Sequence, residues 1–481
     1  MENQYVPTIG LEIHAELKTA SKMFCSCPND PEPSKPNINV CPICLGHPGT
    51  LPVLNMEAIR HVLRVGLSVN GSLADFTEWD RKNYFYPDIP KGYQISQYKY
   101  PLISGGELSG IAIERIHLEE DTAQSTHDTH KKSLVDFNRS GLPLMELVTK
   151  PVIHDAKTAV TFAKELQLLL RYLSVGDANM QKGEMRIEAN ISLAKKSDTE
   201  NKKFGTKTEI KNLNSFRALE QSIAFEISRQ TSLLSHGGKV VQETRGWDDK
   251  KEETFSQRIK ESSHDYRYFP DPDIPKLKIS EIKEFHPDVL METIPELPWN
   301  KRERLQNDYQ LTVKEVDLLI ESPDIANYFD SIVSSFKGDQ KKIRLTANYL
   351  LTDYLGMRNR EENKDHEMIP ADSFSKLIDM IASGTISSRG AKDLLSHMSK
   401  DTSSSPTDLA DKHGLIQKSD SADLEPMIVK ILADNVSVVN EYKNGKTASL
   451  QYLIGQVMKL ARGSANPEIV RKILIDKLTK A

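Results

Sequence analysis

Apolar and polar residues alternate one by one along several early segments of the chain, which is the pattern of half-buried β-strands. The alternation predicts strands over residues 8–17, 184–193 and 206–212. In the first of them, Ile9, Leu11 and Ile13 face one way, whereas Glu12 and His14 face the other. Because successive side chains of a strand point to opposite faces, Glu12 and His14 should project together from one side of a sheet.

Two segments of the same region follow a helical period instead. Asp155 is a suitable N-cap for a helix that runs to Leu173, because its carboxylate can accept hydrogen bonds from the first free backbone N–H groups. A second helix is predicted over residues 215–234, and the glycines at 237 and 238 end it. We therefore expect an antiparallel sheet flanked by helices, which is an α+β fold.

Strand signals fade after about Trp299, and helical periods replace them. A polar stretch over residues 400–406 is typical of a hinge. Beyond it, apolar residues follow the i, i+3, i+4, i+7 spacing of an amphipathic helix at Leu450, Leu453, Ile454, Val457, Met458 and Leu460. The second part of the chain should therefore be all-α.

Length and composition indicate the number of domains and exclude several classes of protein. A chain of 481 residues suggests about three domains. Its net charge of 63 − 68 = −5 argues against a simple basic nucleic-acid coat, although a local basic face remains open. No apolar run approaches the roughly 18 residues that span a membrane, and the start shows no signal-peptide pattern. Only four cysteines, all between positions 25 and 44, exclude a disulfide scaffold and favour a reducing cytoplasmic location.

The four cysteines form the strongest local motif. Cys25 and Cys27 are separated from Cys41 and Cys44 by thirteen residues, and Gly46 follows the second pair. Two close pairs can supply four thiolates to one tetrahedral Zn²⁺, and such a site is structural because no position remains for water. The first pair is C-x-C rather than the commoner C-x-x-C, and four free buried thiols are the alternative.

Carboxylates and cations share the polar faces of the other predicted strands. Arg186 and Glu188 lie on one face, and Lys207, Glu209 and Lys211 lie on another. Mg²⁺ takes a few carboxylates together with substrate phosphates, and interleaved cations bind phosphate, so these faces could form a Mg–nucleotide site. The alternative is the ordinary solvated face of an antiparallel sheet.

Two questions about this face stay open in the sequence. The period of residues 111–120 is mixed, so it does not decide whether Glu119 or Glu120 shares the functional face. The familiar nucleotide motifs are also missing, because no G-x-G-x-x-G follows a strand and the Gly445-Lys-Thr447 run lacks the first glycine of a P-loop. If ATP binds, it binds in an unusual fold.

Tyrosines stand beside cations in two proline-spaced segments, residues 79–97 and 264–273. Tyr84 and Lys82 belong to the first of them. Aromatic rings next to cations suit stacking on a base or ribose with charge on phosphate. A packed loop held rigid by its prolines is the alternative.

Several ordered motifs together resemble the B subunits of tRNA-dependent amidotransferases, and the likeness runs nearly end to end. The motifs are Ile9-Gly-Leu-Glu-Ile-His14, Cys41-Pro-Ile-Cys-Leu-Gly-His-Pro-Gly-Thr-Leu-Pro-Val-Leu-Asn55, Asp80-Arg-Lys-Asn-Tyr-Phe-Tyr-Pro-Asp88, Lys91-Gly-Tyr-Gln-Ile-Ser-Gln97, Ile116-His-Leu-Glu-Glu-Asp121, Glu209-Ile-Lys-Asn-Leu-Asn-Ser-Phe216, His264-Asp-Tyr-Arg-Tyr-Phe-Pro270, Leu453-Ile-Gly-Gln-Val-Met-Lys459 and Gly463-Ser-Ala-Asn-Pro467.

The resemblance implies an architecture and a reaction. It implies a cradle domain over residues 1–292, a helical domain over 293–408 and a small helical YqeY-like tail over 409–481 that contacts tRNA. Members of the family use ATP and Mg²⁺ to phosphorylate the side-chain carboxylate of Glu-tRNA(Gln), and in many organisms of Asp-tRNA(Asn). A separate glutaminase subunit supplies ammonia to the acyl phosphate, and a small third subunit holds the other two together.

The resemblance also assigns residues. It implies that Mg²⁺ is held, directly or through water, by Glu12, His14, Glu120 and Glu209. It favours Glu120 over Glu119 at the position that periodicity left open. Catalysis, the aminoacyl pocket and the ATP contacts would further involve Lys82, Tyr84, Arg186, Glu188, Lys207 and Lys211.

Two departures from the family pattern stand out. Gln124 occupies a position that is usually Lys, and Glu188 stands where many members have Asp. Some relatives lack part of the cysteine set, so the expected zinc is structural rather than catalytic. A non-catalytic, zinc-containing tRNA-binding scaffold is the alternative function, and convergence of the carboxylates in space would distinguish the enzyme from it.

Overall fold

The computed structural model describes residues 4–30, 33, 35–127, 132–200, 203–259, 266–358, 367–417, 421–461 and 465–480. The chain divides into two compact units, Met1–Pro298 and Trp299–Ala481. The change from strand to helix patterns near Trp299 coincides with this boundary. The finer division into three domains, at residues 292 and 408, stays a prediction.

The first unit is a mixed sheet with helices. Its strands are β1 (Tyr5–Glu16), β2 (Ser72–Leu73), β3 (Phe76–Thr77), β4 (Asp80–Asn83), β5 (Tyr93–Ser96), β6 (Ile103–Ser104), β7 (Glu107–Leu108), β8 (Ile111–Glu120), β9 (Gln124–His127), β10 (Ser133–Asp136), β11 (Pro143–Thr149), β12 (Met185–Lys195), β13 (Thr208–Leu213), β14 (Glu243–Asp248), β15 (Glu253–Ile259), β16 (Phe269–Pro270) and β17 (Leu277–Lys278). Its helices are α1 (Met56–Ser68), α2 (Ala156–Tyr172), α3 (Lys196–Glu200), α4 (Phe216–Ser235) and α5 (Pro287–Met291).

The main sheet has the strand order β15-β14-β13-β12-β1-β11-β8-β6-β2, and β7 also pairs with β8. Neighbouring strands run antiparallel, as expected, except that β13 and β14 are parallel. The parallel pair arises because α4 lies between these strands in the chain and carries the backbone back before β14 begins. The α+β assignment is confirmed, but the sheet is mixed.

Strand β1 lies inside the sheet, between β11 and β12. Ile9, Leu11 and Ile13 are at most 1% exposed, whereas Glu12 and His14 on the opposite face are half-buried. The predicted alternation is therefore present, and it separates an apolar core face from a polar face.

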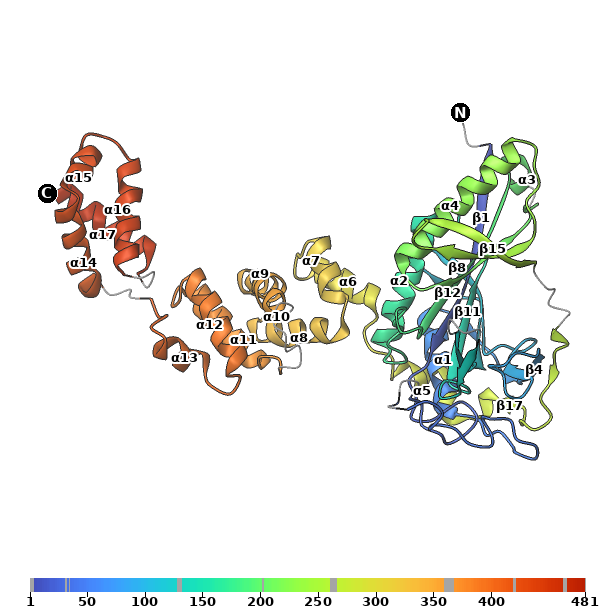
Figure 1. Ribbon diagram of the computed structural model, residues 1–481. Helices are drawn as coiled ribbons and strands as arrows, with labels where there is room; N and C mark the ends of the chain where they lie inside the picture. Colours follow the sequence, from blue (N-terminus) through green and yellow to red (C-terminus); the bar gives the residue numbers. More distant parts are fainter. Residues whose placement is uncertain are drawn as a thin grey trace. The chain divides into compact units, whose positions relative to one another are not determined.

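The two helices expected in this unit are present, and Asp155 caps the first of them as predicted. Asp155 accepts a hydrogen bond from the backbone N–H of Thr158 at the start of α2, and Ser215 accepts one from Ala218 at the start of α4. The two helices pack side by side along the sheet (Figure 1). A further long helix, α1, was not predicted; Asn55 caps it through two backbone N–H groups.

The second unit is helical in all its described parts. Its elements are α6 (Pro298–Asn307), α7 (Val313–Ile320), α8 (Pro323–Val333), α9 (Gln340–Asn348), a π-helical stretch (Tyr349–Tyr354), α10 (Leu355–Arg358), α11 (Ala371–Ala382), α12 (Ser388–Lys400), α13 (Pro406–Lys412), α14 (Ser421–Asp434), α15 (Val436–Lys443), α16 (Ala448–Leu460) and α17 (Pro467–Lys480). None of the helices in the described ranges combines the length and apolarity that a bilayer crossing needs.

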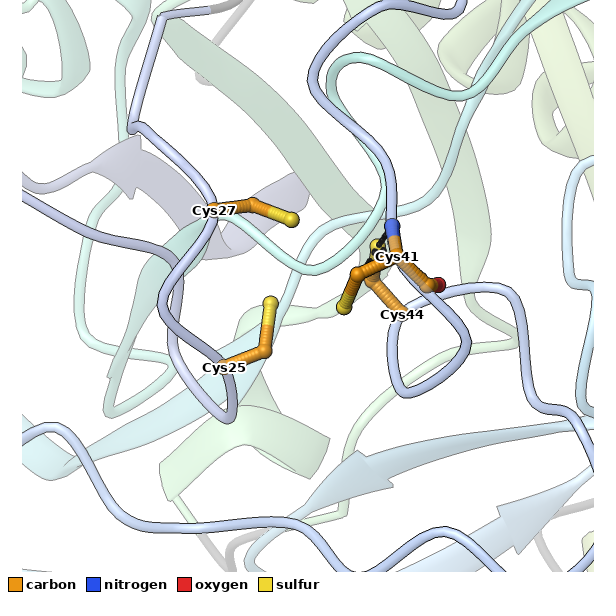
Figure 2. A group of neighbouring side chains, drawn as sticks. All are labelled: Cys25, Cys27, Cys41 and Cys44. Carbon is orange, nitrogen blue, oxygen red and sulfur yellow. Dashed lines mark hydrogen bonds between the residues drawn. The ribbon is translucent and has the colours of Figure 1, made fainter.

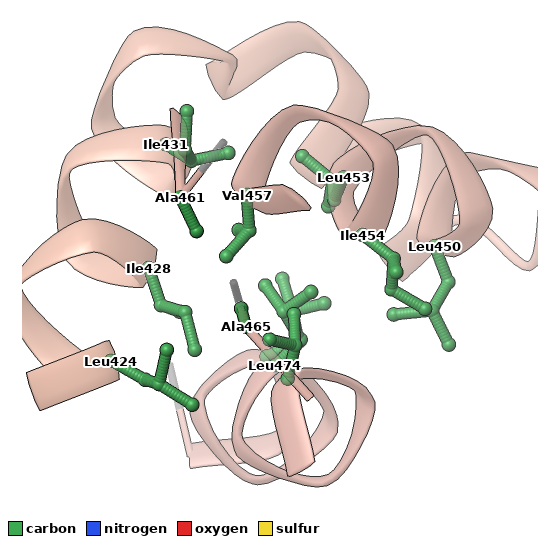
Figure 3. Close-up of a cluster of buried hydrophobic side chains, with 12 residues drawn as sticks. Leu424, Ile428, Ile431, Leu450, Leu453, Ile454, Val457, Ala461, Ala465 and Leu474 are labelled. Atoms are coloured by element: carbon green, nitrogen blue, oxygen red, sulfur yellow. The ribbon is translucent and has the colours of Figure 1, made fainter. Parts of the chain in front are cut away.

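Helices α14, α16 and α17 supply a separate apolar cluster near the C-terminus (Figure 3). Leu453 and Val457 of α16 are fully buried in it, opposite Leu474 of α17. The predicted apolar stripe is therefore largely confirmed, although Leu460 at its end is 41% exposed.

Candidate active site

One face of the main sheet gathers charged side chains in register. Glu12 of β1 lies opposite Glu188 of β12, and His14 lies opposite Arg186. On the other side of β1, His14 lies opposite Glu146 of β11. Directly opposite residues of antiparallel strands have Cβ atoms roughly 5 Å apart, so this register forces carboxylates close together. Carboxylates this close repel one another unless bound protons or cations neutralise part of their negative charge.

Five side chains converge on this face. Nε2 of His14 lies 3.2 Å from a carboxylate oxygen of Glu146 and 3.6 Å from one of Glu119. Nε2 of His117 lies 3.4 Å from Glu146 and 3.7 Å from Glu119. Possible ligand atoms of Glu12, His14 and Glu146 lie within 4.8 Å of one another, and so do those of His117, Glu119 and Glu146. We refer to these five residues as the acidic cluster.

The pKa values of the acidic cluster reflect this crowding. Burial, together with the charges of Glu146 and Glu188, raises the pKa of Glu12 to about 7. Burial alone would lower the pKa of His14, but its hydrogen bond to Glu146 and the charges of Glu146 and Glu119 outweigh it and raise the pKa to about 9. A cation that binds here could replace these protons, so the donor set fits a divalent metal ion.

Two basic side chains on β12 and β13 neutralise neighbouring carboxylates. A guanidinium nitrogen of Arg186 donates to Asp121 at 2.7 Å, and Nζ of Lys211 donates to Glu188 at 2.6 Å. Burial would lower the pKa of Lys211, but Glu188 and Glu209 outweigh it and raise it. Both cations therefore stay charged at the edge of the acidic cluster.

Lys82 reaches the same space from β4, which belongs to a separate three-stranded sheet with β5 and β16. Its Nζ lies 5.9 Å from the ring centre of Tyr84 and 5.2 Å from that of Tyr266. Burial would lower the pKa of Lys82, but the charge of Glu119 outweighs it and raises the pKa well above its ordinary value. Lys82 is therefore a fixed positive charge beside aromatic rings.

These groups border a polar cavity of about 410 Å³, which lies in the size range of small-molecule sites. It is lined by Glu12, His14, Lys82, Tyr84, Tyr86, Asp88, Gln94, Glu119, Asp121, Thr122, Leu144, Arg186, Glu188, Lys211 and Tyr266. The structure thus brings most of the sequence-predicted residues into one pocket.

Glu120 does not line this cavity, and the role in Mg²⁺ binding that the resemblance gave it stays a prediction. Its carboxylate accepts a hydrogen bond from the backbone N–H of Ile95 at 2.8 Å and from Nζ of Lys91 at 2.7 Å. Adjacent residues of a strand point to opposite faces, so Glu119 and Glu120 cannot both face the pocket. The structure selects Glu119.

Two further predicted residues lie at the margin. Glu209 is buried on β13, where it accepts a hydrogen bond from the hydroxyl of Thr244 at 2.9 Å and lies 3.9 Å from Nζ of Lys211. Lys207 precedes β13 and is exposed. Neither residue lines the cavity, and Gln124 at the start of β9 is exposed as well. The roles that the resemblance gave to Glu209 and Lys207 stay predictions.

Sequence reasoning missed two members of the acidic cluster, Glu146 and His117. Glu146 is the one charged residue in the apolar strand Pro143–Thr149 and is 5% exposed, and this isolation was the available signal. His117 is 3% exposed and lies next to Glu146 only through the pairing of β8 with β11. The predicted segment at 264–273 begins at His264 and Asp265, which lie outside the described residues.

The four cysteines converge as their spacing predicts, from two neighbouring loops (Figure 2). Their sulfur atoms lie within 4.8 Å of one another, and those of Cys41 and Cys44 are 3.8 Å apart. Four sulfurs at about 2.3 Å from a tetrahedral Zn²⁺ would stand about 3.8 Å apart, so the arrangement fits that ion. A hydrogen bond with Cys25 lowers the pKa of Cys44 to about 5 against the effect of burial.

A polar pocket beside a donor set that could hold a cation, in the same unit as a cluster of four cysteines, defines a candidate enzyme domain. The family model of the GatB/GatE catalytic domain matches residues 7–283, and that of the GatB domain matches residues 327–478. The chain therefore belongs to the GatB/GatE family.

Curated relatives match the chain over nearly its whole length. Proteins of Carboxydothermus hydrogenoformans, Thermoanaerobacter pseudethanolicus and Persephonella marina are 39%, 40% and 40% identical to it. The alignments cover 99% of this chain and 99%, 100% and 100% of the relatives. All three relatives are named as B subunits of aspartyl/glutamyl-tRNA(Asn/Gln) amidotransferase.

Proposed function

We propose that this chain is the subunit of a heterotrimeric amidotransferase that converts Glu-tRNA(Gln) to Gln-tRNA(Gln), Asp-tRNA(Asn) to Asn-tRNA(Asn), or both. It would phosphorylate the side-chain carboxylate of the attached amino acid with Mg–ATP. Ammonia released from glutamine by a partner glutaminase subunit would then displace the phosphate, and a small third subunit would hold the other two together.

The observation that carries the proposal is the convergence of Glu12, His14 and Glu119 on a polar cavity that Lys82 also lines. The buried carboxylate of Glu146 lies 3.2 Å from His14, next to this cavity. A structural scaffold has no need of buried carboxylates forced together in this way, because their repulsion destabilises the fold. The geometry therefore favours the enzyme over the non-catalytic tRNA-binding scaffold.

The residues divide the chemistry between them. The substrate carboxylate forms a bond to the γ-phosphorus of ATP as the bond to ADP breaks, and charge spreads over the phosphoryl oxygens. Lys82, Lys211 and Arg186 place positive charge around the cavity and would orient these oxygens. The acidic cluster would hold Mg²⁺, which offsets phosphate charge when bound.

The second half of the reaction requires ammonia to lose a proton. Nitrogen attacks the carbonyl carbon of the acyl phosphate, phosphate leaves, and the amide releases one proton to a base. The carboxylates that line the cavity, among them Glu188 and Asp121, lie where they could accept it. The cysteine cluster lines no part of this cavity, which supports a structural role for the proposed zinc.

Amidation of both misacylated tRNAs by the reconstituted heterotrimer tests the proposal and decides the substrate. We expect ATP- and Mg²⁺-dependent amide formation with at least one tRNA. His14→Ala should abolish it and leave part of the glutaminase activity of the heterotrimer, because glutamine is hydrolysed in another polypeptide. Full amidation by His14→Ala, or tRNA binding without any amidation by the wild-type heterotrimer, would support the scaffold instead.

A further inference from the structure

Lys22 is a buried cation beside the cysteine cluster. Its side chain is fully shielded from solvent, and its Nζ donates to the backbone carbonyls of Ser140 at 2.7 Å and Phe137 at 3.2 Å. Both of these acceptors are neutral. A buried ammonium group costs several kcal/mol unless a negative charge lies near it, so hydrogen bonds to carbonyls alone leave it undercompensated.

The geometry places this cation against the thiols. The backbone N–H of Lys22 donates to the carbonyl of Cys27 at 2.9 Å, so the lysine belongs to the loop that carries the first cysteine pair. A Cβ added to Gly141 would lie 3.4 Å from Cβ of Cys44 and 3.7 Å from Cδ of Lys22. It would also lie 3.9 Å from Oε2 of Glu120, a carboxylate that already accepts a hydrogen bond from Nζ of Lys91. The aliphatic stem of Lys22 therefore borders the same small gap as the second pair.

A cysteine cluster that holds zinc carries a net negative charge, which a neighbouring cation would offset. Four thiolates and one Zn²⁺ carry two net negative charges, and two of the four cysteines, Cys27 and Cys44, are buried at 9% and 4% exposure. We propose that Lys22 is the internal counter-ion of the tetrathiolate metal site. The inference rests on the proposed zinc and is independent of the amidation reaction.

Lys22 also contacts a turn that lies between the cysteine cluster and the polar cavity of the candidate active site. Its two carbonyl partners belong to the turn at residues 137–141, and Arg139 in this turn lies 3.5 Å from the Asp121 carboxylate that lines the cavity. Loss of zinc would release the two cysteine loops, against which Lys22 packs, from each other. The same change would therefore loosen this turn.

Zinc affinity of the full-length chain, measured by competition with a chromophoric chelator, tests the proposal. We expect Lys22→Met to weaken zinc binding by about 10- to 100-fold, as for other groups that surround metal ligands. Lys22→Arg keeps the charge and should stay within about threefold of the wild type. The matched control is Lys18→Met, because Lys18 is exposed and paired with Asp177 at 3.0 Å, and it should change nothing.

Removal of zinc gives a second readout. Because bound zinc stabilises the folded state more when it binds more tightly, stripping zinc should lower the melting temperature of the wild type more than that of Lys22→Met. A Lys22→Met protein that is folded and binds zinc within about threefold of the wild type would overturn the proposal and leave Lys22 as a cap for two carbonyls. A wild-type chain that binds no zinc would overturn it too, without touching the amidation proposal.

A measurement on the wild type covers the case in which the Lys22 variants do not fold. Amine-reactive labelling followed by mass spectrometry compares Lys22 with Lys18 in the zinc-loaded and the stripped protein. We expect labelling of Lys22 to accelerate at least about tenfold on stripping, because the turn at 137–141 opens, while Lys18 labels equally in both. Equal labelling of Lys22 in both states would contradict the coupling.

Discussion

The acidic cluster and the cysteine cluster are two candidate metal-binding donor sets that the chain assembles in different ways. The cysteines come from a single stretch of 20 residues, from Cys25 to Cys44, and their four sulfurs lie within 4.8 Å of one another. The acidic cluster draws Glu12, His117 and Glu146 from three strands and borders an open cavity. A closed site stabilises a loop, whereas an open one leaves room for a substrate.

The largest expected loss of amidation activity follows from a substitution in the acidic cluster. Glu146→Gln keeps the shape of the side chain but removes the carboxylate shared by both donor sets. We expect amidation by the reconstituted heterotrimer to fall by at least about 10³-fold, as for loss of a group that stabilises transition-state charge. Glutaminase activity of the same heterotrimer is the control, and amidation within tenfold of the wild type would exclude Glu146 from the site.

The neighbouring pair Glu119 and Glu120 gives a matched comparison across one strand. Glu119→Gln should lower amidation by about 10²-fold and raise the Mg²⁺ concentration needed for half-maximal rate, because Glu119 faces His14 and Lys82. Glu120→Gln should keep the Mg²⁺ dependence and lower stability instead, because it breaks a buried pair with Lys91. The reverse result would restore the assignment made from the family motif.

The raised pKa of Glu12 predicts a pH effect in the metal-free protein. The unfolded chain releases this proton near the ordinary value of 4.5, whereas the folded protein holds it to about 7. Folding therefore favours the protonated form, and this group lowers stability as the pH rises from 4.5 to 7. Denaturation at several pH values should show a smaller decline in Glu12→Gln, and equal slopes in both proteins would contradict the shift.

The smallest loss of amidation activity is expected from a substitution in the cysteine cluster. Cys44→Ser removes one thiolate and should abolish tight zinc binding, while kcat of the folded heterotrimer changes by less than about threefold because the cysteines do not line the catalytic cavity. Metal content and amidation at saturating substrate measure the two outcomes. A large fall in kcat without a change in stability would mean that the two clusters are not separate in function.

Local sequence patterns predicted many of the strands and helices of the fold. Period-two alternation identified β1 and β12, the cap Asp155 placed the start of α2, and the helical period placed α4, because these signals act within a few residues. Helix α1 was not predicted from the sequence, although Asn55 is a suitable N-cap for it. The parallel β13–β14 pair depends on how α4 crosses the sheet, which no local pattern encodes.

By itself, the sequence determined the cysteine cluster, the polar faces that carry Glu12 and His14, and, through family motifs, the proposed reaction. Only the tertiary structure decided that Glu119 rather than Glu120 lines the pocket and that Glu146 and His117 belong to the acidic cluster beside it. The physical reason is register: strand pairing fixes which residues of distant segments stand opposite one another, and a one-residue shift would turn every side chain to the other face.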